Sequence, residues 1–391
     1  MINIIFLGLV SFFSDISSEM VYPLIPLYLT GAFGATPVLV GIIEGIAESL
    51  ASLLKVFSGY ITDKYNKKKP IAFFGYATGI IYKLALIVAG SWAGILAARV
   101  VDRIGKGVRT APRDVLVAES APEDSMGRAF GIHKALDMAG SAVGILLAFF
   151  LMSGMTGGSA DYKKIFAISI IPAALGLVMM LFVKENKRAP EKQETRERFW
   201  HKIKNLDGNL KLYLLVALIF TLGNSSNTFL LLRAKSIGFT DTGVVILYFV
   251  YNVTAAYLAI PFGKLSDKIG RKKVLVGGYF AFALVYMGFA FAGSKPLLIA
   301  AFVVYGLYTA MVAGTERALI TQVAPPELKG TMLGLHSTIV GIALLPASVI
   351  AGLLWDKVGA WAPFTLGALL SVIAALMLLL LLNKQRPQAA V

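Results

Sequence analysis

The sequence predicts an all-α integral membrane protein in which twelve transmembrane helices form two pseudo-symmetric six-helix bundles. The chain of 391 residues is 57% hydrophobic and 15% charged, with a mean hydropathy of +0.74, whereas soluble domains carry about 25% charge. Its apolar runs reach the ~20 residues that a helix needs to cross a bilayer. Its basic residues gather in alternate loops, and one short basic segment occurs twice, half a chain apart.

The apolar runs define the spans in order along the chain. We expect them near residues 4–29, 38–61, 70–90, 92–118, 127–152, 164–183, 210–232, 243–265, 274–293, 296–321, 330–355 and 361–383. No basic segment or small-residue cleavage site marks the first run as a signal peptide, so we expect a retained helix there. The most charged segment follows the sixth run, which predicts an N-terminal bundle, a central cytoplasmic loop and a C-terminal bundle at 1–184, 185–209 and 210–391.

Charge alternates from one loop to the next. The connection 30–37 is uncharged, whereas the following loop holds Lys64, Lys67, Lys68 and Lys69. Positive residues concentrate on the cytoplasmic side of membrane proteins. We therefore predict that both termini are cytoplasmic and that the chain crosses the inner (cytoplasmic) membrane many times. The same placement accounts for the net charge of +15 and argues against nucleic-acid binding.

Several kinds of site are excluded by composition. The chain has no cysteine, which removes disulfides, thiolate metal sites and thiol redox chemistry. The three histidines have no clustered spacing, and no phosphate-cradling glycine loop occurs. We expect no cofactor, no metal centre, no ATP-driven step and no enzymatic activity, and we expect a monomer in the lipid bilayer.

The repeated basic segment reads GYITDKYNKKK at 59–69 and GKLSDKIGRKK at 263–273. A constant offset of 204 positions relates Gly59 to Gly263, Asp63 to Asp267, Arg113 to Arg317 and Pro122 to Pro326. Charged residues and prolines held at one offset indicate two homologous halves.

These features resemble the major facilitator superfamily. Six plus six spans, a charged central loop and the pattern G-x-L-x-D-K-x-G-R-K-K after the second span of each half are similar to that family over essentially the whole chain. The second copy matches the pattern closely, whereas the first has Ile61, Asn66 and Lys67 at three of its positions. The resemblance implies a secondary transporter that moves a small solute by alternating access.

The resemblance also implies that the loop motif acts as a cytoplasmic gate. The expected gate residues are Gly59, Asp63, Arg113, Gly263, Asp267, Arg271 and Arg317. Small residues let membrane helices approach closely, which assigns a packing role to the two glycines. The repeat predicts that Asp63 pairs with Arg113 and that Asp267 pairs with Arg317. The alternative is that the basic residues serve topology alone.

Carboxylates occur inside the first two spans. Asp15 and Glu19 lie one turn apart on the first, and Glu44 and Glu48 one turn apart on the second. At ~1.5 Å per residue, Asp15 lies roughly 16 Å along the helix from Ile4. A carboxylate at that depth is costly and should face a cavity, a cation or the bundle interior. Asp15, Glu19 and Glu48 are therefore candidates for proton coupling or solute binding, and a structural ion pair is the alternative.

The fourth span carries cations on one helical face, at Arg99, Arg103, Lys106 and Arg113. Cations cannot all face lipid, so this face should line water, solute or carboxylates. Arg99 matches the arginine of the superfamily's fourth-span motif, with Asp102 at the glutamine and Arg103 at the glycine. We predict an ion-paired network in which Arg99 and Arg103 meet Asp15 and Glu19, joining spans one and four.

The C-terminal half offers amides and aromatic rings. Asn224 and Asn227 interrupt the seventh span where it aligns with the acidic segment of the first, and amides there can hydrogen-bond a solute. An aromatic wall, or simple helix packing, is predicted for Tyr248, Tyr251, Tyr305 and Tyr308.

The fifth span contains Gly140 and Gly144. This resembles in part the fifth-span signature of proton-coupled drug exporters, and a small-residue packing face is the alternative.

We favour proton-coupled export by antiport of a small solute, with Asp15, Glu19 and Arg99 central. One alternative is uptake of an organic or inorganic anion held by Arg99, Arg103 and Lys106. Another is a lipid flippase or a non-transporting sensor built on the same fold.

Overall fold

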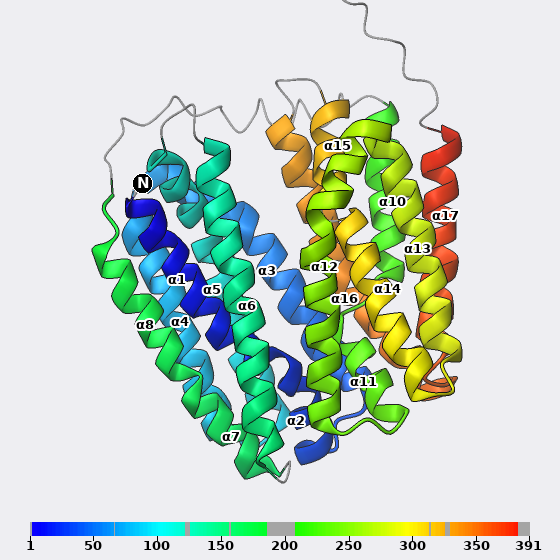
Figure 1. The fold of residues 1–391 in the computed structure, drawn as a ribbon, viewed down its shortest axis with the longest axis horizontal. Coiled ribbons are helices and arrows are strands. Elements are labelled where there is room, and N and C mark those ends of the chain that lie inside the picture. Colours follow the sequence, from blue (N-terminus) through cyan, green and yellow to red (C-terminus); the bar gives the residue numbers. More distant parts are fainter. Residues whose placement is uncertain are drawn as a thin grey trace, which may run out of the picture.

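The computed structural model describes residues 2–65, 67–121, 126–155, 158–185, 208–312, 314–324 and 329–381. Over these ranges the helices form twelve membrane-length spans, six in each half of the chain (Figure 1). Eleven of them are both long and apolar enough to cross a membrane. The remaining one is the fourth span, which carries the charged face predicted above.

The N-terminal spans are α1 (Ile2–Glu19) with α2 (Ile25–Phe33), α3 (Pro37–Tyr65), α4 (Lys68–Val88), α5 (Trp92–Glu119), α6 (Met126–Ser153), and α7 (Ser159–Ile168) with α8 (Ile170–Phe182). The C-terminal spans are α10 (Gly208–Gly223) with α11 (Thr228–Ser236), α12 (Asp241–Ile269), α13 (Arg271–Phe291), α14 (Lys295–Val312) with α15 (Thr315–Val323), α16 (Lys329–Lys357) and α17 (Ala362–Leu381). The predicted all-α fold of twelve spans is confirmed.

Four spans that the sequence predicts as single helices are interrupted. The breaks in the first and seventh spans correspond, because the offset of 204 carries Met20 onto Asn224. In the first span, the 3₁₀ turn η1 (Tyr22–Leu24) separates α1 from α2. Pro23 and Pro26 lack the backbone N–H that a continuous helix needs there.

The outer surface is apolar, as lipid contact requires. Large hydrophobic side chains are exposed along α4, α8 and α13, among them Phe74, Leu84, Leu181 and Leu284. Ion-paired side chains such as Arg99 and Arg103 lie instead between the helices, where they are buried.

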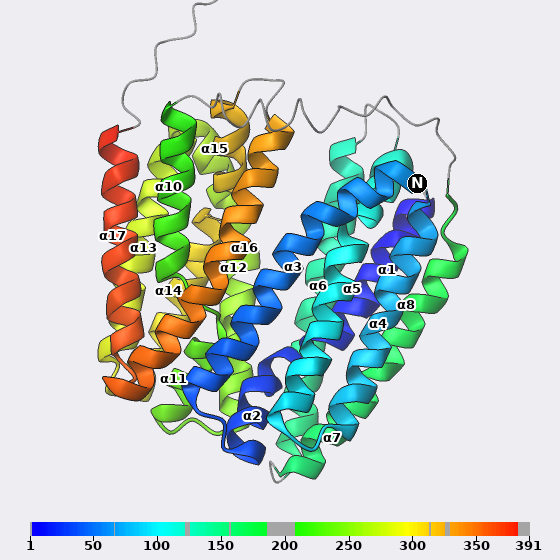
Figure 2. The ribbon, with the colours of Figure 1, turned by 180° about the vertical axis from the view of Figure 1, so that it is seen from behind.

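The two halves meet along two helix pairs, α3 with α16 and α6 with α12 (Figures 1 and 2). The first pair is in close contact. A Cβ atom at Gly41 would lie 2.3 Å from the Ser348 carbonyl oxygen. Ser49 Oγ donates a hydrogen bond of 2.5 Å to the Gly341 carbonyl oxygen and accepts one of 3.1 Å from the Leu345 amide. These contacts join α3 to α16 at mid-height.

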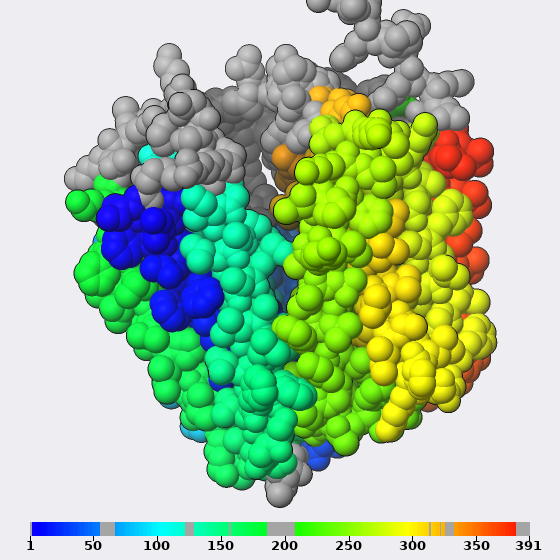
Figure 3. Space-filling model, in the orientation of Figure 1, coloured from blue at the N-terminus to red at the C-terminus, as the bar shows by residue number. Residues whose placement is uncertain are grey.

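The bundle has two ends that differ in chemistry. We call the end at which α1 begins and α17 ends the basic end; Lys68, Lys184 and Lys272 lie there, and α2, α7 and α11 lie at the far end (Figure 1). Figure 3 shows the halves touching toward the far end and separated by a recess toward the basic end.

Two hydrogen bonds join the halves at the far end. The Val38 amide donates to Asp356 Oδ2 at 3.3 Å, and the Tyr162 hydroxyl donates to Asp241. Asp241 also pairs with Lys235. This conformer is therefore closed at the far end.

Candidate functional site

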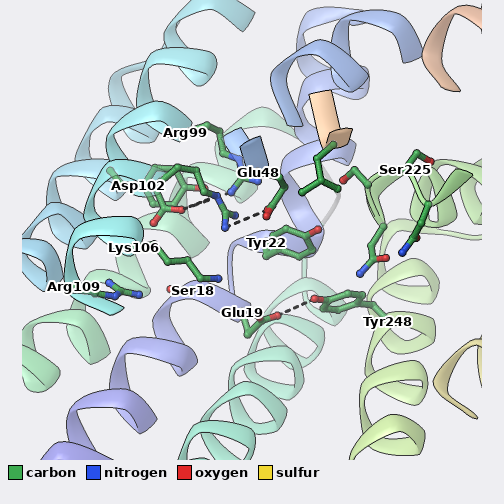
Figure 4. A pocket seen from close by; sticks show the side chains of 16 residues that line it. Ser18, Glu19, Tyr22, Glu48, Arg99, Asp102, Lys106, Arg109, Ser225 and Tyr248 are labelled. Carbon is green, nitrogen blue, oxygen red and sulfur yellow. Dashed lines mark hydrogen bonds and ion pairs between the residues drawn. The ribbon is translucent and has the colours of Figure 1, made fainter. Parts of the chain in front are cut away.

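A polar cavity of about 300 Å³ lies between the halves, at the level of the breaks in the first and seventh spans (Figure 4). The side chains that line this inner cavity are Ser18, Glu19, Tyr22, Glu48, Tyr82, Arg99, Asp102, Arg103, Lys106, Arg109, Asn224, Ser225, Ser226, Asn227, Tyr248 and Leu344. All charged members belong to the N-terminal half, and the C-terminal half contributes amides, hydroxyls and one apolar side chain. The inner cavity brings together every residue predicted for proton coupling or solute binding except Asp15.

An outer cavity of about 410 Å³ continues from the inner one toward the basic end. Glu19, Glu48, Arg103, Lys106 and Arg109 line both cavities. The described side chains around the outer cavity all come from the N-terminal half, and they add Asp15, Ala51, Ser52, Thr110, Arg113, Lys134, Asp137 and Ser141. The two cavities together form a polar path from mid-height toward the basic end.

Arg99 forms the most deeply placed ion pair of the site. The whole residue is 1% exposed, and its Nη2 atom lies 2.5 Å from Glu44 Oε2. Glu44 is likewise 1% exposed, and Asp102 lies 3.8 Å from Arg99 Nη1. A buried guanidinium needs such compensation, because an unpaired charge in a membrane interior is costly.

Arg103 repeats this arrangement one turn along α5. It lies 3.2 Å from Glu48 and 3.4 Å from Asp102. The predicted network between spans one and four is therefore wrong in its partner helix, since α3 supplies the carboxylates. Glu44 and Glu48 are one turn apart on the face of α3 that contacts α5, while the acids of α1 face the cavity.

Lys106 and Arg109 have no ion pair among the described residues. Lys106 is exposed within the cavity and points into it in Figure 4. The Arg109 guanidinium is buried 4.5 Å over the ring of Tyr76, and this cation–π contact holds it against the wall. Lys106 is thus the cation most available to a bound solute.

The two acids of α1 reach different partners. Glu19 accepts a hydrogen bond of 3.2 Å from the Tyr248 hydroxyl, which crosses from α12 of the other half. Asp15 interacts carboxyl to carboxyl with Asp137 of α6. Asp137 also lies 2.5 Å from Lys134. Because two carboxylates repel one another at contact, this pair is suited to holding a proton.

Sequence reasoning did not select Asp137 or Glu44 as site residues. Like Asp15, Asp137 is an acid within an apolar span, and this signal in the sequence is enough to find it. Helical phase alone did not identify which face of α3 contacts α5, so the partner of Arg99 could not be inferred.

The C-terminal wall consists of amides backed by tyrosines. Asn224 donates to the Tyr308 hydroxyl at 3.2 Å, and the Tyr305 hydroxyl donates to Asn227 at 2.7 Å. The rings of Tyr248, Tyr251, Tyr305 and Tyr308 follow one another with centroids 5.1–5.7 Å apart. Of these four rings, Tyr248 alone lines the inner cavity, and Tyr251, Tyr305 and Tyr308 are buried. Helix packing, the alternative to an aromatic wall, therefore describes three of the four.

The fifth span packs closely on the first. A Cβ atom at Gly140 would lie 2.3 Å from the Phe12 carbonyl oxygen, and one at Gly144 would lie 2.5 Å from that of Ile16. Both glycines therefore serve the packing of α6 against α1.

The gate residues of the second repeat do not form the predicted pair. Asp267 lies 3.6 Å from Arg271, its neighbour in the same hairpin, and Arg317 is exposed. Arg271 also donates to the Ala318 carbonyl oxygen at 2.9 Å, linking the hairpin to α15. A Cβ atom at Gly263 would meet no atom of the described chain within 4 Å, so this glycine makes no close helix contact in this conformer. The recess at the basic end separates the halves that a closed gate would join.

In the first repeat, Arg113 pairs with its neighbour Asp114 at 2.8 Å. The surroundings of Gly59 and the side chain of Asp63 lie outside what the structure describes. The hairpin of the second repeat turns at Gly270, whose φ of 100° favours glycine.

Comparison with known proteins identifies the family. The model of the Major Facilitator Superfamily matches residues 7–250 and 212–391. An "uncharacterized MFS-type transporter" of Methanocaldococcus jannaschii is 38% identical over 383 residues, covering 96% of this chain and 94% of the relative. An uncharacterized protein of Mycobacterium tuberculosis is 24% identical over 90% of this chain and 85% of its own length.

Solved structures share the fold. The nucleoside transporter NupG superposes with a TM-score of 0.81 at 13% identity, covering 96% of this chain and 99% of that one. A D-xylose–proton symporter superposes with a TM-score of 0.79 at 14% identity, covering 96% of both chains. With the family model and the archaeal relative both spanning the chain, the protein belongs to the major facilitator superfamily of membrane transporters and is not an enzyme.

Proposed function

We propose that the protein is a proton-coupled secondary transporter that exports a small solute with at least one charged group in exchange for protons. The observation that best supports this proposal is that Glu19 lines both polar cavities and Asp15 lines the outer one, while neither carboxylate forms an ion pair among the described residues. A carboxylate in such a place can bind either a proton or a cationic group of a solute. Competition for the same carboxylate is the physical basis of exchange.

The groups that face Asp15 determine how readily it takes a proton. They are Asp137 of α6, Glu19 of α1, Lys106 of α5 and, around the same outer cavity, Glu48, Arg103, Arg109, Arg113 and Lys134. The neighbouring carboxylates favour the protonated form, and the cations favour the ionised form. Binding or loss of a solute cation near Glu19 shifts this balance and couples the two events.

The proposed transport cycle is a rocking motion of two units, residues 1–184 and 210–391, around the inner cavity. We assign the basic end to the cytoplasm, since positive loops are retained there, which puts both termini on that side of the inner membrane. The conformer described above is then inward-facing. One chain supplies the whole cavity, so a monomer suffices.

In the outward-facing conformer, we propose that Asp63 and Asp267 close the basic end by pairing with Arg113 and Arg317. The charge reversal Asp63→Arg should abolish transport, and adding Arg113→Asp should restore at least a tenth of it. If the double variant transports no faster than either single variant, the proposed pairing of Asp63 with Arg113 is wrong.

A pH-sensitive dye inside proteoliposomes tests the coupling. Solutes found by a thermal-shift screen of metabolites, drugs and metal ions are added outside vesicles without an imposed gradient. Antiport predicts that the interior becomes alkaline as solute enters, because protons leave. Asp15→Asn should reduce this signal at least tenfold, whereas Asp161→Asn, at the far end beside Lys164, should retain it. A solute flux without any pH change, or one that Asp15→Asn leaves intact, argues against the proposal.

A second candidate is proton-linked uptake of an anion, favoured by Lys106, which forms no ion pair with any residue that the structure describes. The same assay separates the two, since symport of an anion with protons acidifies the interior. Flux of a fluorescent phospholipid between leaflets would instead favour a flippase, and absence of any flux would favour a sensor.

A further inference from the structure

Two side chains of opposite charge share the cavity without pairing. Lys106 of α5 and Glu19 of α1 line both the inner and the outer cavity, and Figure 4 shows them directed into the same space. Among the described residues, ion pairs at N–O distances up to 4.0 Å include neither of them. Arg99 and Arg103, by contrast, are already matched by carboxylates of α3.

Unmatched charges at mid-membrane are costly, and a ligand that supplies the missing partners lowers that cost. Glu19 offers a carboxylate to a protonated amine, and its one described partner is the neutral hydroxyl of Tyr248. Lys106 offers an ammonium group to a carboxylate, sulfonate or phosphate. Each of the two side chains therefore selects one charged group of a ligand.

A ligand with only one charge fits less well. An anion at Lys106 alone would meet the carboxylates of Asp15, Glu19 and Glu48 around the same space. A cation at Glu19 alone would meet Lys106 and the guanidinium of Arg103. Like charges brought together in a site of low dielectric repel strongly, so each single-charge ligand leaves one group uncompensated.

The neutral parts of the lining suit the body of such a ligand. The rings of Tyr22 and Tyr248 lie 5.6 Å apart beside the two charges. Across the cavity, Asn224 donates to Tyr308, and its amide oxygen can accept a hydrogen bond from the ligand. A volume of about 300 Å³ is at the small end of ligand pockets and suits a metabolite.

We propose that the transported solute is a zwitterion, with a protonated amine held by Glu19 and an anionic group held by Lys106. This assignment rests on the transport function proposed above and names its substrate class. It also excludes lipophilic drugs as the main cargo.

Binding to purified full-length protein in nanodiscs, without a pH gradient, tests the assignment. The probes share one skeleton: 4-aminobutyrate carries both charges, butyrate only the anion and butylammonium only the cation. Glycine and 6-aminohexanoate vary the spacing between the charges. We expect at least one aminocarboxylate to bind ten or more times more tightly than either single-charge probe.

Two single variants and a charge-swapped double variant assign the roles. Glu19→Gln should weaken the amine contact and raise the relative affinity of butyrate, and Lys106→Gln should raise that of butylammonium. The charge swap Glu19→Lys with Lys106→Glu should recover aminocarboxylate binding, because a zwitterion can bind in reverse, which a general loss of folding would not allow. Lys164→Gln, an exposed change at the far end, serves as the matched control.

Equal or tighter binding of butyrate or butylammonium overturns the assignment, as does failure of every aminocarboxylate to bind. These results are separate from coupling. Zwitterion binding without solute-dependent proton movement would refute antiport and leave the substrate class intact. Proton-coupled flux of a singly charged solute would refute the substrate class and leave proton coupling intact.

Discussion

At the scale of single residues, the Arg99–Glu44 pair is the least exposed ion pair of the described chain. Its two side chains are 2% and 1% exposed. A pair at this depth contributes little net stability when intact, because desolvation offsets attraction, yet removing one partner leaves a buried charge alone. The pair therefore holds Arg99 of α5 against α3 and thereby shapes the cavity wall.

Glu44→Gln should destabilise the protein markedly. Arg99 would keep only Asp102, at 3.8 Å, and an uncompensated buried charge costs on the order of 3–5 kcal/mol. Thermal unfolding in detergent should show a clearly lowered Tm, and the double variant Glu44→Gln with Arg99→Gln should recover part of it. Asp114→Asn, which breaks the more exposed pair with Arg113, should cost at most about 1 kcal/mol. Equal Tm values for the two single variants would contradict this account.

Residue types in the spans are enough to predict most of the site. Glu19, Glu48, Arg99 and Lys106 do line the cavity, because charged groups inside a membrane have few other places to lie. Their pairing was not predictable. It depends on the rotation of α3 about its axis, which is determined by packing on α5 and α16 rather than by helical period.

At the scale of elements, the breaks in the first and seventh spans contribute lining residues to the inner cavity, among them Tyr22 and Asn224. The sequence predicts twelve spans well, since hydropathy and loop charge both report them. It indicates the seventh break through the polar run at 224–227. The break at η1 lies in an apolar stretch, and prolines alone do not distinguish a kink from a full interruption.

The α3–α16 contact should not tolerate bulk. Gly41→Leu would add atoms where a Cβ already lies 2.3 Å from the Ser348 carbonyl oxygen, and such overpacking typically costs about 1–3 kcal/mol. We expect a lower Tm and at least a tenfold loss of transport. Gly131→Ala, where nothing lies within 4 Å, should be neutral or stabilise by up to about 1 kcal/mol. If the Gly41→Leu protein has an unchanged Tm and flux, α3 and α16 can move apart at this point to accept the larger side chain, and the close contact is not essential.

At the scale of the whole molecule, the far end holds this conformer closed. Tyr162 and Asp241 join the halves there, with Lys235 on the same carboxylate, and the Val38 amide binds Asp356. In the proposed cycle of alternating access, one end opens as the other closes, so we expect these bonds to influence the balance between the two conformers.

Asp241→Asn should shift the population toward the conformer open at the far end. The asparagine loses its charge for Lys235 and accepts a weaker hydrogen bond from Tyr162. Because the chain has no cysteine, spin labels can be placed on cysteines introduced at Lys164 and Ser236 without background. Pulsed electron spin resonance should show a larger long-distance fraction than in the labelled parent. Distance distributions that match the parent, or that Asp161→Asn changes equally, would show that the bond does not hold the end closed.

The near balance of positive and negative charge around the inner cavity bears on which driving force the proposed proton exchange would use. The paired cations and carboxylates belong to one half, so they move together and transfer little net charge when the halves rock. A zwitterion adds none. In the antiport proposed above, each proton exchanged for it would carry one whole charge across the bilayer, and the membrane voltage would contribute about 2.3 kcal/mol per 100 mV to every such exchange. Export of an electrically neutral solute would in this way be powered by voltage as well as by acidity.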